Sequence, residues 1–163
     1  MTVAEVIQFL RLEPLPGEGG RYRETWRSAN TCPHPAHGSI RPLGTTILYL
    51  LAKGQCSRLH RLPGVEVYFH QGGASLEMLL LEEPDQPEGR RVILGPIGFP
   101  NALQQVVVPA GTVQGSRVLG DGDWSLVGTA MAPGFDLADW AQPDLTALVK
   151  RYPGWADLIW ALG

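Results

Sequence analysis

Short runs of alternating apolar and polar residues, separated by turns that contain glycine or proline, follow one another along most of the chain. The 163 residues include 20 glycines and 14 prolines, a density that leaves room only for short elements between turns. No βαβ alternation and no glycine-rich phosphate loop is present. A succession of short strands with frequent turns predicts an all-β sandwich or barrel.

The expected strands each present two faces, because successive side chains of a strand point to opposite sides. Pro63-Gly64 predicts a turn, and Gly72-Gly73 and Asp121-Gly122 predict tight hairpins. Residues 29–43 are expected to form a loop. The predicted strands are Tyr22–Ser28, Thr45–Lys53, Ser57–Leu62, Glu66–Gln71, Leu76–Leu81, Arg91–Leu94, Gln105–Val108, Thr112–Leu119 and Trp124–Met131.

Both ends of the chain have helical patterns. Thr2 and Glu5 form a capping-box sequence before apolar residues at helical spacing, which predicts a helix within residues 1–12. Asp144 is a suitable N-cap for a helix in the tail, which ends before Pro153. We therefore expect a single domain, 1–163, with an N-terminal helix (1–12), a β-structure (20–132) and a helical tail (133–163).

Charge and cysteine content narrow the class of protein. The formal charge is -3, with acids and bases interspersed, so no basic face for nucleic acid is expected. The apolar runs are too short to span a bilayer, and the first residues do not resemble a signal peptide. With only Cys32 and Cys56, a disulfide framework is not expected. These features favour a cytoplasmic protein with reduced thiols and no membrane partner.

The segment around residues 32–37 contains residue types that bind metals. Cys32, His34 and His37 form a C-x-H-x-x-H run, but Pro33 and Pro35 interrupt it and no fourth ligand is near in the sequence. Structural zinc sites need four well-placed ligands. An ordinary exposed loop is therefore the preferred interpretation.

Polar residues recur on one face of two neighbouring predicted strands. Alternation places His60 on one face of its strand together with Arg58 and Leu62. In the next strand, Glu66, Tyr68 and His70 share a face. Unpaired buried polar groups are costly, so a β-structure with such an interior must hold water or a ligand. A small-molecule pocket is the favoured interpretation, ahead of a purely structural polar network.

These residues also carry a family resemblance. The spacing of Gly54, His60, Leu62, Glu66 and Gly73 resembles the first motif of the cupin superfamily. The run Pro109-Ala110-Gly111 followed by Gln114 resembles the second. Beyond these two motifs, the sequence resembles the DUF985 (Cupin_5) family over nearly the whole chain. The segments that carry this resemblance are Glu13–Pro14, Gly19–Ser28, Ser57–Leu62, Val106–Gly111, Ser125–Gly128 and Ala132–Asp136.

The resemblance implies a cupin jelly roll, which is a double-stranded β-helix, with a short N-terminal helix and C-terminal helices. It also implies a homodimer and a family whose activity is largely unassigned, and a fold alone identifies no function. Metal-binding cupins generally offer three histidines and one glutamate. Here Leu62 and Gln114 occupy two of the histidine positions. Leucine has no lone pair to donate, and an amide is a weak ligand for transition metals.

Three hypotheses for function follow. In the first, the chain binds a small molecule and performs isomerase- or epimerase-like acid–base chemistry, with His60 as base, Glu66 as its orienting group and Tyr49 or Tyr68 as proton donor. In the second, it is an oxygenase or lyase that uses a divalent transition metal held by His60, Glu66 and Gln114. In the third, it is a non-catalytic ligand-binding or storage protein. Further ligand-binding candidates are Glu24, Arg27, Thr46, Ser57, His70, Gln114, Ser116, Phe135 and Asp136.

Overall fold

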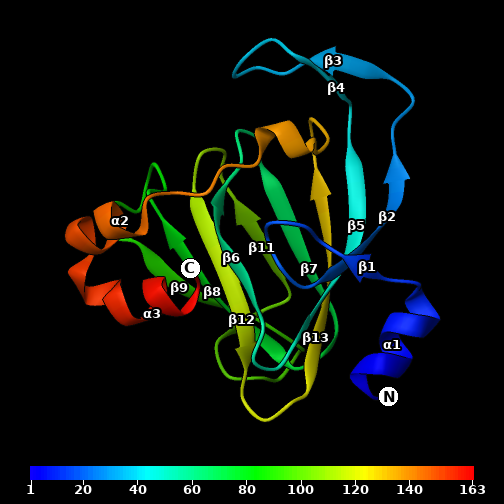
Figure 1. Ribbon diagram of the computed structural model, residues 1–163, viewed down its shortest axis with the longest axis vertical. Coiled ribbons are helices and arrows are strands. Elements are labelled where there is room, and N and C mark those ends of the chain that lie inside the picture. The colour runs from blue at the N-terminus through cyan, green and yellow to red at the C-terminus, as the bar shows by residue number, and fades with distance from the viewer.

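Two β-sheets face each other in the computed structural model, which describes residues 1–163 (Figure 1). The six-stranded sheet has the order β1 (Glu13–Pro14), β2 (Arg21–Arg27), β5 (Thr45–Ala52), β13 (Trp124–Met131), β7 (Glu66–Gly73) and β11 (Gln105–Val108). The five-stranded sheet has the order β10 (Ala102–Leu103), β9 (Arg90–Leu94), β8 (Ser75–Leu81), β12 (Val113–Leu119) and β6 (Cys56–Arg61). All nine predicted strands are present, with ends that differ from the expected ones by two residues at most.

Most short connections carry the chain from one sheet to the other. The links β6–β7, β7–β8, β11–β12 and β12–β13 each join strands of opposite sheets. The prediction that Gly72-Gly73 and Asp121-Gly122 form hairpins was therefore wrong. Gly73 has φ of 75°, and this left-handed conformation turns the chain between sheets where a hairpin would keep it in one. The result is the all-β jelly roll that the sequence predicted.

Apolar side chains form three packed layers, one between the sheets and one outside each of them. The layer between the sheets includes Leu51, Met78 and Val127. Helix α1 (Val3–Leu10) covers the outer face of the six-stranded sheet, where Val6 packs on Leu50. Because β8 is covered on both faces, all seven of its residues are buried.

The C-terminal segment covers the outer face of the five-stranded sheet (Figure 1). It contains η1 (Leu137–Asp139), α2 (Leu145–Arg151), η2 (Pro153–Trp155) and α3 (Ala156–Ala161). The two predicted caps are confirmed: Thr2 and Glu5 form a complete capping box, and Asp144 accepts hydrogen bonds from two backbone N–H groups of α2. None of the helices has the length and apolar character needed to cross a membrane.

A β-bulge changes which side chains of β6 face the interior. His60 pairs with Gln114 and Ser57 pairs with Ser116, so three steps on β6 oppose two on β12. Ser57 and His60 both lie inside as a result, and Leu59 packs outside against the tail. The expectation that Arg58 shares a face with His60 was wrong, because the bulge leaves Arg58 exposed.

The loop predicted for residues 29–43 is instead a small β-hairpin. Strands β3 (Thr31–Pro33) and β4 (Ile40–Pro42) pair with each other and extend beyond the two sheets as an arm (Figure 1). Arg41 donates two hydrogen bonds to Asp139 of η1, at 2.7 and 2.6 Å. This contact between distant segments holds the arm in place, and a pattern based on neighbouring residues does not reveal it.

Candidate functional site

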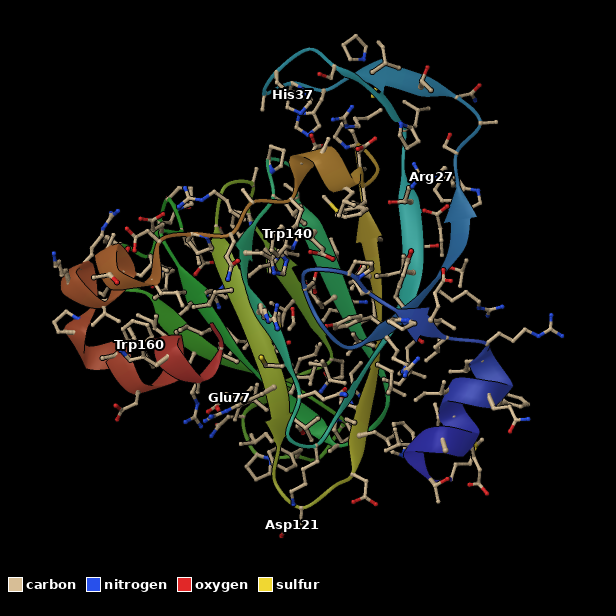
Figure 2. All side chains as sticks on the ribbon, in the orientation of Figure 1. Arg27, His37, Glu77, Asp121, Trp140 and Trp160 are labelled. Atoms are coloured by element: carbon tan, nitrogen blue, oxygen red, sulfur yellow. The ribbon has the colours of Figure 1, made fainter.

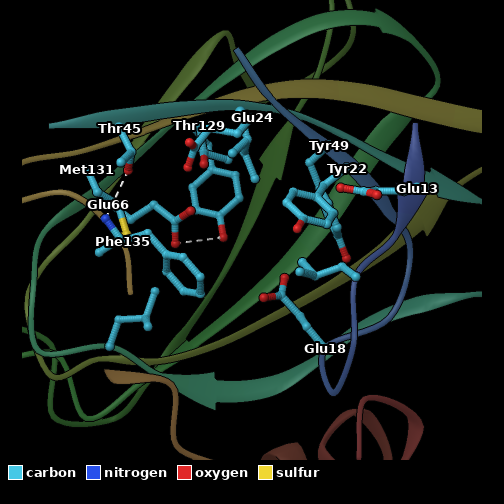
Figure 3. A pocket seen from close by; sticks show the side chains of 14 residues that line it. Glu13, Glu18, Tyr22, Glu24, Thr45, Tyr49, Glu66, Thr129, Met131 and Phe135 are labelled. Carbon is cyan, nitrogen blue, oxygen red and sulfur yellow. Dashed lines mark hydrogen bonds between the residues drawn. The ribbon is translucent and has the colours of Figure 1, made fainter. Parts of the chain in front are cut away.

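A cavity of about 210 Å³ lies on the inner face of the six-stranded sheet (Figure 3). Strands β2, β5, β7 and β13 each contribute two or three alternate side chains to its wall, and the chain before β2 and after β13 closes it. The wall combines carboxyl groups and tyrosines with aliphatic groups. The lining residues are Glu13, Leu15, Glu18, Tyr22, Glu24, Thr45, Ile47, Tyr49, Leu62, Glu66, Tyr68, Thr129, Met131 and Phe135.

Glu18 reaches this cavity on a loop between β1 and β2. Gly19 and Gly20 have φ of 103° and 67°. A Cβ atom at Gly19 would lie 2.6 Å from the Cys56 carbonyl oxygen, and one at Gly20 would lie 2.7 Å from the Tyr49 hydroxyl. Only glycine permits this approach. The loop is then held by the Tyr49 hydroxyl, which donates to the Gly19 carbonyl at 3.0 Å.

Glu66 is the most deeply buried carboxyl group of the cavity wall, with 6% of the residue exposed. The Tyr68 hydroxyl and the Gln114 amide both donate to its Oε2, at 3.1 and 2.8 Å. Neither of these two donors engages Oε1. Burial raises the pKa of Glu66, and the nearby carboxyl group of Glu18 raises it further; His60, Thr129 and Gln114 oppose this in part.

His60 lies behind the cavity wall and is 1% exposed. Its Nδ1 lies 2.7 Å from the Arg58 carbonyl oxygen. Because a carbonyl can only accept, Nδ1 carries a proton and donates it to this oxygen. Glu18 Oε2 lies 3.7 Å from Nε2. The ring of Trp140, which is labelled in Figure 2, stacks on the imidazole with the ring centroids 6.0 Å apart.

The two tyrosines of the site remain protonated over the physiological range. Burial raises the pKa of both Tyr49 and Tyr68 well above its usual value, and the carboxyl groups of Glu18 and Glu66 add to the effect. Both hydroxyls already donate, Tyr49 to a backbone carbonyl and Tyr68 to Glu66. They therefore fix the positions of the loop and of the carboxylate.

Five of the residues predicted from the sequence line the cavity, and three more lie directly behind it. Those in the wall are Glu24, Tyr49, Glu66, Tyr68 and Phe135. Those behind it are His60, Gln114 and Ser57, whose hydroxyl donates to Glu18 Oε1 at 2.7 Å. The expected contact of His60 with Glu66 is replaced by contacts of His60 with Arg58 and Glu18. The expectation that Glu66 orients His60 is not met, because the Glu66 hydrogen bonds run to Tyr68 and Gln114.

The remaining predicted residues lie outside the cavity wall. Thr46 faces outward, where its hydroxyl meets that of Thr25, because the side that faces inward belongs to Thr45 and Ile47. Arg27 is bound to Glu24 on the exposed rim, and His70 lies near the Ala74 carbonyl at the end of β7. Asp136 caps η1, and Ser116 is buried on β12.

Several lining residues escaped the sequence-based prediction. Thr45 and Ile47 share the face of Tyr49, so strict alternation from that residue would have selected them and excluded Thr46. Thr129 and Met131 lie on a predicted strand. The sequence did not show which strands would lie beside this one, so it did not place these residues next to Tyr49 and Glu66. No sequence pattern pointed to Glu18, because it lies in an irregular loop whose path depends on contacts with β5 and β6.

The residues at the expected metal position do not fit a transition-metal centre. Gln114 directs its amide N–H toward Glu66, so it acts as a donor there. Leu62 takes the place of a ligand in the wall. The ligand atoms of His60, Glu18 and Glu66 do not come within 4.8 Å of one another as a group. We therefore derive no chemistry through a metal at this position.

A second cluster of ligand types lies under the arm, where His34, His37 and Asp139 come together. The two rings stack at 4.3 Å, and each Nδ1 accepts a backbone N–H, from Ala36 and Ser39. Each Nδ1 is therefore already occupied as an acceptor, and His37 Nε2 lies 3.2 Å from Asp139 Oδ1. Asp139 is engaged by Arg41. These contacts describe a structural cluster that fastens the arm; Cys32 is not part of it.

Comparison with known proteins agrees with this architecture. A hypothetical protein from Leishmania major is 31% identical, and the match covers 100% of this chain and 99% of that chain with a TM-score of 0.90. A protein from Shewanella oneidensis is 32% identical over 100% of this chain and 98% of that chain, with a TM-score of 0.84. None of the curated proteins compared with the chain matches it.

More distant structures share only the fold. Oxalate decarboxylase from Bacillus subtilis, whose structure is described with Mn(II) centres, is 12% identical; the match covers 93% of this chain and 37% of that chain, with a TM-score of 0.55. Residues 4–142 match the family described as Cupin superfamily (DUF985). The two facing sheets, the cavity between them and this match together show that the chain belongs to the Cupin_5 (DUF985) family of the cupin superfamily.

Proposed function

We propose that the chain binds a small organic molecule in the cavity and that Glu66 exchanges a proton with it, in chemistry of the isomerase or epimerase type. The observation that carries this proposal is the state of Glu66. It is a buried carboxyl group with a raised pKa, it lines the cavity, and its two hydrogen-bond donors leave Oε1 to a ligand. A carboxyl group whose pKa is moved toward neutrality is suited to act as general base and then general acid.

The surrounding residues give each step a defined partner. Tyr68 and Gln114 hold Oε2, so the carboxyl group keeps one orientation while Oε1 removes a proton from a bound ligand and returns it. Ile47, Leu62 and Met131 give this face of the cavity an apolar surface. His60 lies behind the wall, so it is a positioning residue, which acts on the ligand through Glu18.

The proposal is tested by solvent exchange in deuterium oxide. Purified protein is incubated with a panel of small compounds that have an acidic C–H bond, and NMR measures both binding and replacement of C–H by C–D. We expect at least one bound compound to exchange, and Glu66→Gln to abolish the exchange even at compound concentrations that saturate its weaker binding. Glu88→Gln, in the exposed turn before β9, is the matched control and should behave as the wild type.

Two results would contradict this function. Binding without exchange would favour a non-catalytic binding or storage protein. Exchange that persists undiminished in Glu66→Gln would show that another group carries the proton. Native mass spectrometry of freshly purified protein complements the experiment, because it reports any small molecule that stays bound through purification.

A further inference from the structure

The charges around the cavity are of one sign. Four of the 14 lining residues are glutamates, and the wall contains no lysine, arginine or histidine. Glu24 is neutralised by Arg27, which donates to both of its carboxylate oxygens at 2.9 and 2.7 Å. Glu13 is exposed. The charge that a ligand meets inside therefore comes from Glu18 and Glu66.

Glu18 provides a separate observation that points to a missing donor. The residue is 9% exposed, and Ser57 donates to its Oε1. Its Oε2 accepts no hydrogen bond, because the facing nitrogen, His60 Nε2, lies 3.7 Å away, beyond hydrogen-bond length. Glu18 lines the cavity, so a ligand bound there is placed to donate to this carboxylate oxygen.

The apolar part of the wall suits the same class of ligand. Four aromatic residues line the cavity: Tyr68 and the three labelled in Figure 3, Tyr22, Tyr49 and Phe135. Aromatic faces attract cations and exclude anions. An anionic ligand would meet two buried carboxyl groups and no compensating cation, which is strongly unfavourable.

From the unpaired Glu18 oxygen, the second buried carboxyl group and the aromatic wall, we propose that the ligand carries a positively charged nitrogen, as a compact organic ammonium compound with an apolar portion. Glu18 Oε2 and Glu66 Oε1 accept its N–H groups, and the aromatic rings contact the carbon portion. This inference rests on the proposed binding function and defines the chemical class of its substrate.

The test uses three probes of equal size and different charge: benzylammonium, benzyl alcohol and benzoate. Isothermal titration calorimetry measures affinity, and NMR of the Met131 and Ile47 methyl groups reports where each probe binds. We expect benzylammonium to bind at least about tenfold more tightly than the alcohol, because hydrogen bonds to charged groups are the stronger ones. Benzoate should not bind.

Substitutions assign the effect to the two carboxyl groups. Glu18→Gln and Glu66→Gln should each lower the affinity for benzylammonium about tenfold and leave that for benzyl alcohol nearly unchanged. Glu88→Gln removes an equal charge outside the cavity and should change neither. Circular dichroism confirms that each variant is folded, and the two cavity variants serve as independent tests if one of them is not.

The outcomes separate this inference from the binding function. If the alcohol or benzoate binds in the cavity as tightly as the ammonium compound, the charge preference is overturned while small-molecule binding stands. If benzylammonium binds best but both glutamine variants bind it as the wild type does, Glu18 and Glu66 are not the recognition groups and the inference fails. If no probe shifts the Met131 or Ile47 signals, both the preference and the proposed binding function are contradicted.

Discussion

At the scale of single residues, Glu66 links the stability of the chain to its chemistry. The groups that face it are Glu18 from the loop, His60 from β6, Tyr68 from its own strand, Gln114 from β12 and Thr129 from β13. Burial is the largest influence on its pKa and the charge of Glu18 is the next, and both favour the protonated form. Ionised Glu66 therefore lowers the stability of the folded chain. If this position had only a structural role, an uncharged residue would serve it better.

This predicts a specific pH dependence. The folded chain holds the Glu66 proton more tightly than the unfolded chain does. Above pH 4.5, the usual pKa of a glutamate, Glu66 is therefore protonated in a larger fraction of folded chains than of unfolded chains. Stability should fall as pH rises from about 4.5 through the raised pKa and then level off. Glu66→Gln removes this contribution. Its denaturant midpoint, measured between pH 4 and 8, should decline less than that of the wild type.

Glu88→Gln provides the comparison, since it removes an exposed carboxyl group and should give a curve parallel to the wild type. Equal declines for wild type and Glu66→Gln would show that the pKa of Glu66 is not raised in the folded chain.

At the scale of elements, the β3–β4 arm is joined to η1 through Asp139, which both Arg41 and His37 contact. Arg41 and Asp139 are both largely buried, and their two hydrogen bonds have the short lengths of a bidentate ion pair. Hydrogen bonds from Arg41 lower the pKa of Asp139. The pair therefore stabilises the arm at neutral pH, and this contribution is lost only as pH falls from the usual 3.8 through the lowered pKa.

Arg41→Gln should release the arm without unfolding the sheets. Losing hydrogen bonds to a charged group costs about 1.5 to 3 kcal/mol. Amide hydrogens within residues 31–42 should then exchange about tenfold faster or more, while those of β8 and β12 stay as slow as in the wild type. Hydrogen exchange with mass spectrometry measures both regions at once. Unchanged exchange in the arm would mean that other contacts hold it.

At the scale of the whole molecule, one edge of the six-stranded sheet is open. β1 pairs with β2 only at Arg21 and Tyr22, so the edge of β2 from Arg23 to Arg27 has no neighbouring strand. Trp26 lies on this edge and is 53% exposed. Free edges pair readily with other strands, and two identical edges meet around a two-fold axis. A second copy of the chain is therefore the expected occupant, which accords with the homodimer predicted from the sequence.

Native mass spectrometry should accordingly show the mass of two chains. Trp26→Glu places a charge at the edge and should convert the dimer largely to monomer. Trp160→Glu on α3, where the side chain is 56% exposed, is the matched control and should remain dimeric (Figure 2). Dissociation by Trp160→Glu alone would place the interface on the tail, and a monomeric wild type would contradict the dimer altogether.

The positions of the strands, the caps of α1 and α2 and the shared face of Glu66 and Tyr68 could be predicted from the sequence. Each depends on residues that are close along the chain: alternation within one strand, a side chain that caps the N–H three residues on, or a turn residue. These local preferences survive folding because the tertiary structure agrees with them.

Other features were decided only when distant segments met. The bulge that turns both Ser57 and His60 inward arises from the register between β6 and β12. Glu18 enters the cavity because Gly19 and Gly20 let its loop approach the backbones of β5 and β6. Pairing between strands far apart in sequence depends on the energy of the whole arrangement, which no local pattern contains. The sequence by itself thus determined the elements and one carboxyl group of the site, and the tertiary structure decided which second carboxyl group faces it.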